Sequence, residues 1–172
     1  LSRRTLLKAT AAGVLGAGAL SATESVRAHD TYEADAPDRL SPTLVRPRPD
    51  QGFNYPYYVY APEPLADEPR PILVEPNNSG NLTDEYTEHL ASAGSRIEHG
   101  IGRTLSEATR IPLLFPVFPR SRSDPTDANT YTHALDRETL KVTTGEAARI
   151  DLQLLAMVEH ARGLLAEMDY PI

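Results

Sequence analysis

The 172-residue sequence contains no cysteine and no tryptophan, and only two of its 17 basic residues are lysine. The missing cysteine excludes disulfide bonds, cysteine-based zinc sites and thiol catalysis. Acidic residues outnumber basic ones and give a net charge of -7, which argues against a protein that binds nucleic-acid phosphates. An acidic, lysine-poor surface suits high salt, where repulsion between like charges is screened.

Several catalytic and cofactor motifs are missing as well. No two glycines lie four residues apart, so the Gly-x-Ser-x-Gly motif does not occur. Gly100 and Gly102 imitate a dinucleotide-binding fingerprint, but the third glycine is lacking and the segment does not follow a strand. Glu85 and His89 have helical spacing, but without a third ligand they indicate solvated helix surface rather than a metal site. The sequence therefore predicts neither a cofactor nor a metal.

Residues 1–28 have the layout of an export signal. The segment Ser2–Lys8, which contains the pair Arg3 and Arg4, precedes a run of small apolar residues. That run is shorter than the about 20 residues that span a bilayer. The segment resembles the twin-arginine signal, which implies that the translocation machinery binds Arg3 and Arg4 and exports the folded protein. An amphipathic or membrane-anchoring helix is the alternative.

Small residues place the signal cleavage site after Ala28 or after Ser21. We expect the mature protein outside the cytoplasmic membrane, secreted or at the cell surface, without a stable membrane span. Residues 29–52 are acidic and interrupted by prolines, so they predict a flexible linker or an extended arm. Residues 53–172 are expected to form the folded domain.

Three strands are predicted in this domain. The first is Phe53 to Tyr60, and Pro56 within it favours the edge of a sheet. Its aromatic stripe indicates strand packing more than a platform for stacking carbohydrate. Ile72 to Glu75 is a short apolar run typical of a central parallel strand, and Leu113 to Phe115 is the third strand.

Helical periodicity fills most of the remaining domain. One helix is expected from Thr83 to Ala91 with an interruption at Gly94, and a second from about Ile97 to Thr109. Ile101, Leu105 and Ala108 form the apolar stripe of the second helix. Strands that alternate with helices predict an α/β class with a mainly parallel sheet and flanking helices.

The longest helical pattern follows a potential capping box, Thr143 and Glu146, and continues to Met168. His160 lies off its apolar stripe and is expected to face solvent. No further strand follows to cover this stripe, which indicates a truncated domain.

One polar loop stands out by its position. It leaves the predicted strand at Glu75 and precedes a helix, which is where open α/β sheets place ligands. A glycine in such a loop lets backbone N–H groups approach a developing oxyanion. An ordinary turn is the alternative. The loop residues are Asn77, Asn78, Ser79 and Gly80.

Here the chain resembles the α/β-hydrolase family, in particular its secreted esterases and depolymerases. The likeness rests on residues 72–80, 112–120, 132–137 and 149–157 and covers 53–172, about the N-terminal half of such a domain. The resemblance implies an oxyanion hole with candidates Asn77, Asn78, Ser79 and Gly80. It also implies a substrate cleft bordered by Arg120, His133 and Arg137.

In this family the nucleophilic serine, the acid and the histidine all follow the long helix. The resemblance therefore implies that no catalytic residue lies in this chain and that His133 is not the triad histidine. We expect an exported serine-hydrolase-like protein that acts on ester bonds by acyl transfer, with this chain as an N-terminal fragment that is inactive alone. A non-catalytic exported α/β binding or surface protein is the alternative.

Overall fold

The computed structural model describes residues 41–65, 68–76, 82–123 and 139–172, all within the compact unit Ala34–Ile172. The predicted export signal of residues 1–28 lies outside the described residues, as does the first part of the predicted linker.

Four strands form one mixed sheet in the spatial order β1-β2-β4-β3. Their bounds are Thr43–Val45 for β1, Tyr57–Tyr60 for β2, Leu73–Val74 for β3 and Leu113–Pro116 for β4. β2 is antiparallel to β1 and to β4, whereas β3 and β4 are parallel. The α/β class is confirmed. The expectation of a mainly parallel sheet is wrong, because β2 pairs antiparallel with both of its neighbours.

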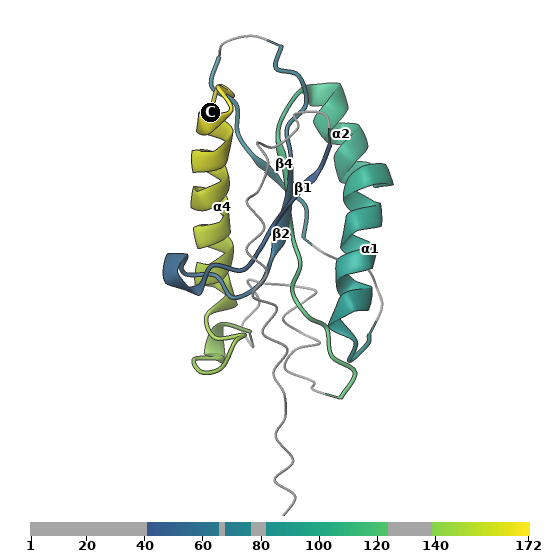
Figure 1. The fold of residues 1–172 in the computed structure, drawn as a ribbon, viewed down its shortest axis with the longest axis vertical. Helices are drawn as coiled ribbons and strands as arrows, with labels where there is room; N and C mark the ends of the chain where they lie inside the picture. The colour runs from purple at the N-terminus through teal and green to yellow at the C-terminus, as the bar shows by residue number, and fades with distance from the viewer. Residues whose placement is uncertain (1–40, 66–67, 77–81, 124–138) are drawn as a thin grey trace, which may run out of the picture. The chain divides into compact units, whose positions relative to one another are not determined.

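Helices cover both faces of this sheet (Figure 1). The α-helices are α1 (Tyr86–His99), α2 (Ile101–Thr109) and α4 (Ile150–Glu167), and the 3-10 helices are η1 (Pro49–Gln51) and η2 (Thr139–Lys141). Figure 1 shows α4 on one side of the strands and α1 with α2 on the other. The parallel connection from β3 to β4 runs through α1 and α2.

β4 carries the centre of the core because its side chains alternate between the two faces. Leu114 packs in one cluster with Met157 and Ala161 of α4, whereas Leu113 and Phe115 pack in the other, which includes Ile97 of α1. All of these residues are fully buried. Burial of each large apolar side chain contributes about 1.5–3 kcal/mol relative to exposure.

The positions of β2 and β3 in the sheet differ from the prediction. β2 is an interior strand because β1, which lies in the segment expected to be a linker, pairs with its outer side. Pro56 precedes β2, so its missing N–H is not needed in the ladder, and its carbonyl accepts the Val117 N–H at 3.0 Å. β3 is an edge strand of the described sheet instead of a central one.

The break in the first helical region lies at Gly100 instead of Gly94. α1 continues through Gly94, where a Cβ would stand 3.0 Å from the Tyr58 hydroxyl oxygen. The predicted stripe of α2 is also wrong, since Ile101 and Leu105 are exposed. α2 turns Gly102 and Ser106 inward instead.

α4 begins at Ile150, after Arg149 in the left-handed region with a φ of 48°. The predicted capping box is therefore wrong: Gln153 Nε2 donates instead to the carbonyl oxygens of Glu146 and Ala148. The apolar stripe is confirmed, and the sheet covers it, contrary to the expectation of an uncovered face. The stripe residues that are buried are Ile150, Met157, Ala161 and Leu165.

Candidate functional site

The parallel strands β3 and β4 end at the same edge of the sheet. Val74 lies opposite Leu114, which confirms that these two predicted strands are neighbours. The Glu75 N–H donates to the Leu114 carbonyl at 3.0 Å, so the parallel alignment continues one residue beyond β3. Because α/β sheets place ligands at the carboxyl ends of parallel strands, this edge is the expected place of a functional site.

Most of the predicted site residues cannot be placed. The oxyanion-hole candidates Asn77, Asn78, Ser79 and Gly80 lie outside the described residues. The cleft candidates His133 and Arg137 do so as well. Their roles stay predictions, whereas the flanks of the first loop, up to Pro76 and from Leu82, are described.

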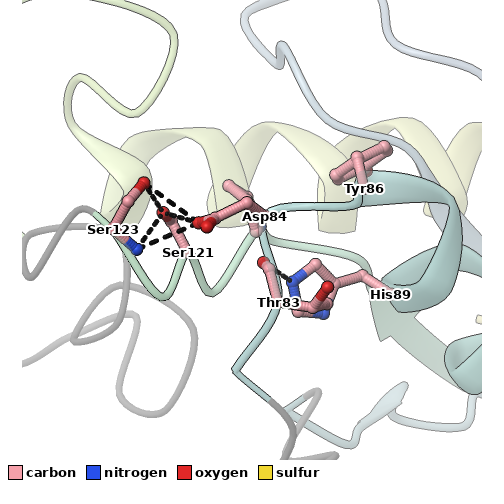
Figure 2. Close-up of a pocket in the computed structure, with 7 residues that line it drawn as sticks. Thr83, Asp84, Tyr86, His89, Ser121 and Ser123 are labelled. Carbon is pink, nitrogen blue, oxygen red and sulfur yellow. Dashed lines mark hydrogen bonds between the residues drawn. The ribbon is translucent and has the colours of Figure 1, made fainter.

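A pocket of about 220 Å³ opens between the start of α1 and the segment that follows β4 (Figure 2). Its walls come from the two chain segments that follow β3 and β4. The lining residues are Thr83, Asp84, Tyr86, His89, Pro119, Ser121 and Ser123.

Asp84 fixes one wall of this pocket. Its Oδ1 accepts hydrogen bonds from Ser121 Oγ at 2.6 Å, from the Arg122 N–H at 2.9 Å, and from the N–H and Oγ of Ser123 at 3.0 Å. These bonds, with that of Ser121 the strongest cause, lower the pKa of Asp84 from 3.8 to about 2. The carboxylate is therefore ionised at physiological pH and holds the segment after β4 against α1.

Tyr86 and His89 form the inner wall from the first turns of α1. The Tyr86 hydroxyl donates to the Val117 carbonyl at 2.8 Å, and its ring contacts the His89 ring. His89 is buried, so the expectation that it lies on solvated helix surface is wrong. Burial follows from its place on the helix face that carries Ala93 and Ile97.

The His89 ring joins the two segments that form the pocket. Its Nε2 lies 3.1 Å from the Thr83 carbonyl oxygen and 3.2 Å from the Arg120 nitrogen. The Arg120 N–H donates to Nε2 in one tautomer, and Nε2–H donates to Thr83 in the other. The Thr83 N–H also donates to the Arg120 carbonyl at 3.1 Å. Arg120, a predicted cleft residue, is thus joined through its backbone to the lining residues Thr83 and His89.

Glu75 lies beside the same strand end but packs away from this pocket. Its carboxylate lies against the backbone of Gly102 in α2, where any larger residue would collide with it. The glycine pair of the rejected dinucleotide fingerprint therefore has a packing role. Gly100 caps the C-terminus of α1, and the missing side chain of Gly102 leaves space for the Glu75 carboxylate.

A second polar cluster lies under α4. The Tyr57 hydroxyl and His160 Nδ1 are 2.6 Å apart, and the Phe53 ring contacts both rings edge-on. Burial raises the pKa of Tyr57 and lowers that of His160. Both groups are therefore neutral at neutral pH; the tyrosine hydroxyl donates to Nδ1 in one imidazole tautomer and accepts from Nδ1–H in the other. The expectation that His160 faces solvent is wrong.

Sequence reasoning missed Asp84, Ser121 and Ser123 as a group. The available signal was the run Ser121-Arg122-Ser123, five residues beyond the end of a buried strand, at the end where ligands bind. Their pairing with Asp84 joins residues 37 to 39 positions apart, which local patterns do not reveal. Within the described ranges, no group of three or more histidine, aspartate or glutamate residues could hold a metal ion.

Within the same ranges, no helix is both long enough and apolar enough to cross a membrane. No protein-family model matches the chain, and neither a curated protein nor a solved structure matches it.

Proposed function

We propose that this chain is the N-terminal part of an exported serine-hydrolase-like protein that cleaves ester bonds by acyl transfer. The observation that supports the proposal is the parallel pair β3 and β4, which ends beside a pocket bounded by the start of α1. Residues 77–80 lie in the chain between β3 and α1, the position that the oxyanion loop has in the α/β hydrolases that the sequence resembles. This is also the sheet edge at which α/β enzymes bind substrate.

In this proposal a serine that follows α4 in the complete protein attacks the ester carbonyl. The alkoxide that develops is stabilised by backbone N–H groups near Ser79 and Gly80, each donor contributing a factor of about 10²–10³ in rate. The acyl group is transferred to the serine as the alcohol of the ester leaves, and water then takes the acyl group, which releases the acid and regenerates the serine hydroxyl. The bonds from Asp84 to Ser121 and Ser123 keep the neighbouring pocket wall in place.

Two observations test the catalytic part of the proposal: the residues encoded beyond Ile172, and the rate of ester hydrolysis by the longer protein. We expect about 5–8 apolar residues followed by Gly-x-Ser-x-Gly beyond Ile172. The product of that frame should hydrolyse p-nitrophenyl acetate, its motif serine→Ala variant should not, and the 172-residue chain should show no turnover. A stop codon directly after Ile172 would contradict the proposal that the protein is an enzyme and would favour a non-catalytic binding protein. Turnover that survives the loss of the motif serine would contradict the mechanism.

Export by the twin-arginine pathway is a separate part of the proposal. The pathway recognises the paired guanidinium groups, so the double substitution Arg3→Lys and Arg4→Lys should leave the precursor inside the cell. The measurement is the ratio of precursor to mature protein in cell and medium fractions. Substitution of Lys8→Arg is the matched control and should leave export unchanged. Equal export of both variants would contradict the assignment.

A further inference from the structure

A hairpin between β1 and β2 lies against α4 (Figure 1). We call residues 46–54, which include η1, the hairpin segment. The Phe53 ring contacts the His160 ring of α4 edge-on, and the Asn54 N–H donates to Gln153 Oε1 of the same helix at 2.9 Å. Phe53 is fully buried, whereas the residues that precede it in the segment are exposed. Phe53 is therefore the anchor of the hairpin segment.

A buried hydrogen bond lies directly beside this anchor. The Tyr57 hydroxyl is 2.6 Å from His160 Nδ1, and the Phe53 ring packs edge-on against both rings. Tyr57 is fully buried, and within the part of the chain that the structure describes its hydroxyl has no other hydrogen-bond partner. A neutral imidazole with its proton on Nε2 offers Nδ1 as the acceptor for the hydroxyl proton. Only a neutral His160 can therefore satisfy the buried hydroxyl.

Protonation of His160 removes the acceptor of this bond. An imidazolium carries N–H donors on both ring nitrogens, so Nδ1–H and the Tyr57 O–H then meet as two donors. A buried donor that loses its acceptor destabilises the packed arrangement, because water satisfies the same donor only when the site opens. The closed arrangement of the two side chains therefore favours the neutral imidazole.

The charged groups around His160 come from the hairpin segment and from α4. Arg48 and Asp50 belong to the hairpin segment, and Glu167 belongs to α4. Burial, with a further effect of Arg48, lowers the pKa of His160 below 6.5, against smaller opposing effects of Glu167 and Asp50. Burial also raises the pKa of Tyr57, so the phenol adds no charge. Proton binding thus favours a state in which the imidazole is more exposed than in the closed one.

We propose that the Tyr57–His160 pair is an acid-sensitive switch that frees the hairpin segment from α4 as the pH falls below neutrality. The hairpin segment opens before the core because it has one buried anchor and follows the short edge strand β1. Segments with few buried contacts open at a lower free energy than core elements. Opening exposes the surface of α4 around His160. The inference stands on these side chains and does not depend on the proposed ester hydrolysis.

The test is amide hydrogen exchange of the 172-residue chain, followed by NMR between about pH 7 and about pH 5.5. Protection factors, which correct for the intrinsic effect of pH on exchange, are compared at Asn54 and at Ala93, a buried residue within α1. Protection of Asn54 should fall by about three- to tenfold, since one pH unit changes the ratio of imidazolium to imidazole tenfold. Protection of Ala93 should stay constant. Constant protection of Asn54, or an equal loss at both amides, would overturn the proposal.

Two histidine variants assign the effect. His160→Gln removes the titrating ring and should make the protection of Asn54 independent of pH. His99→Gln removes an exposed histidine at the end of α1 and should keep the pH dependence of the parent chain. Equal behaviour of the two variants would contradict the switch. Where His160→Gln disturbs the fold, the parent chain decides: the His160 ring signals and the protection of Asn54 should change with the same midpoint, and different midpoints would contradict the proposal.

Discussion

At the scale of single residues, close packing explains the glycines of the α1–α2 crossover. A side chain at Gly100 would overlap the carbonyl oxygen of Arg96, which accepts the Gly100 N–H. A side chain at Gly102 would overlap the Glu75 carboxylate. The two glycines thus let α1 end abruptly and let α2 approach the end of β3.

Substitution of Gly100→Ala should therefore destabilise the protein by about 1–3 kcal/mol, because the added methyl group forces the backbone apart. The matched control is Gly163→Ala in α4, where a Cβ would meet no atom within 4 Å. The control should stabilise by about 0.5–1 kcal/mol through helix propensity. Urea unfolding of both variants measures the difference. Equal free energies of unfolding would contradict the crossover geometry.

Asp84 makes a pH-dependent contribution to stability. Its pKa is about 2 in the folded protein and 3.8 in an unperturbed chain, so folding favours the deprotonated carboxylate. The contribution is present above pH 3.8 and is lost as the pH falls through about 2, because the unfolded state then binds more protons. Asp84→Asn should show a smaller loss of thermal stability over this range than the parent chain. Parallel stability curves for the two proteins would contradict the Asp84 network.

At the scale of elements, the docking of α4 on the sheet combines an apolar stripe with the Tyr57–His160 hydrogen bond. Removing the hydroxyl by Tyr57→Phe should cost about 1 kcal/mol in unfolding free energy, the usual net value of one such bond. A double-mutant cycle with His160→Gln separates this bond from packing changes. A coupling energy of zero would show that the two side chains do not interact in solution.

His160 also predicts a pH dependence of this docking. Burial, with a further effect of Arg48, lowers the pKa of His160 below 6.5, against smaller opposing effects of Glu167 and Asp50. The folded state therefore binds a proton less readily than the unfolded state. The stability that the uncharged His160 contributes is fully present above pH 6.5 and is lost as the pH falls below that value. The His160→Gln variant should lose this part of the pH dependence, measured by urea unfolding between pH 7 and 5. If the free energy of unfolding of the variant depended on pH as strongly as that of the parent chain, the assignment to His160 would be contradicted.

Elements with strong local signals could be predicted from the sequence. The unbroken apolar run of β4 and the helical periodicity of α4 are patterns within one segment, and each is enough to show which of its residues are buried. β1 could not be predicted, because three residues between prolines show no period, and its pairing with Tyr57 to Val59 is set by tertiary contact. The inward position of His160 likewise depends on Tyr57, a residue 103 positions away.

At the scale of the whole molecule, the mixed sheet brings together segments that are distant in sequence. β2 lies between β1 and β4 and is antiparallel to both, an arrangement that strand order along the chain does not specify. The neighbourhood of β3 and β4 was predictable because a helical crossover joins parallel strands. The pocket at their end was not, since it needs Asp84 and the segment after β4 to meet.

The central functional claim concerns the loop between β3 and α1, and the most direct measurement is kcat for p-nitrophenyl acetate in the product of the extended frame. Ser79→Pro removes one backbone N–H from the proposed oxyanion site, and Asn81→Pro makes the same chemical change two residues later. We predict that Ser79→Pro lowers kcat by about 10²–10³ with little change in KM, while Asn81→Pro stays near the parent value. Equal values of kcat in the two variants would contradict the claim.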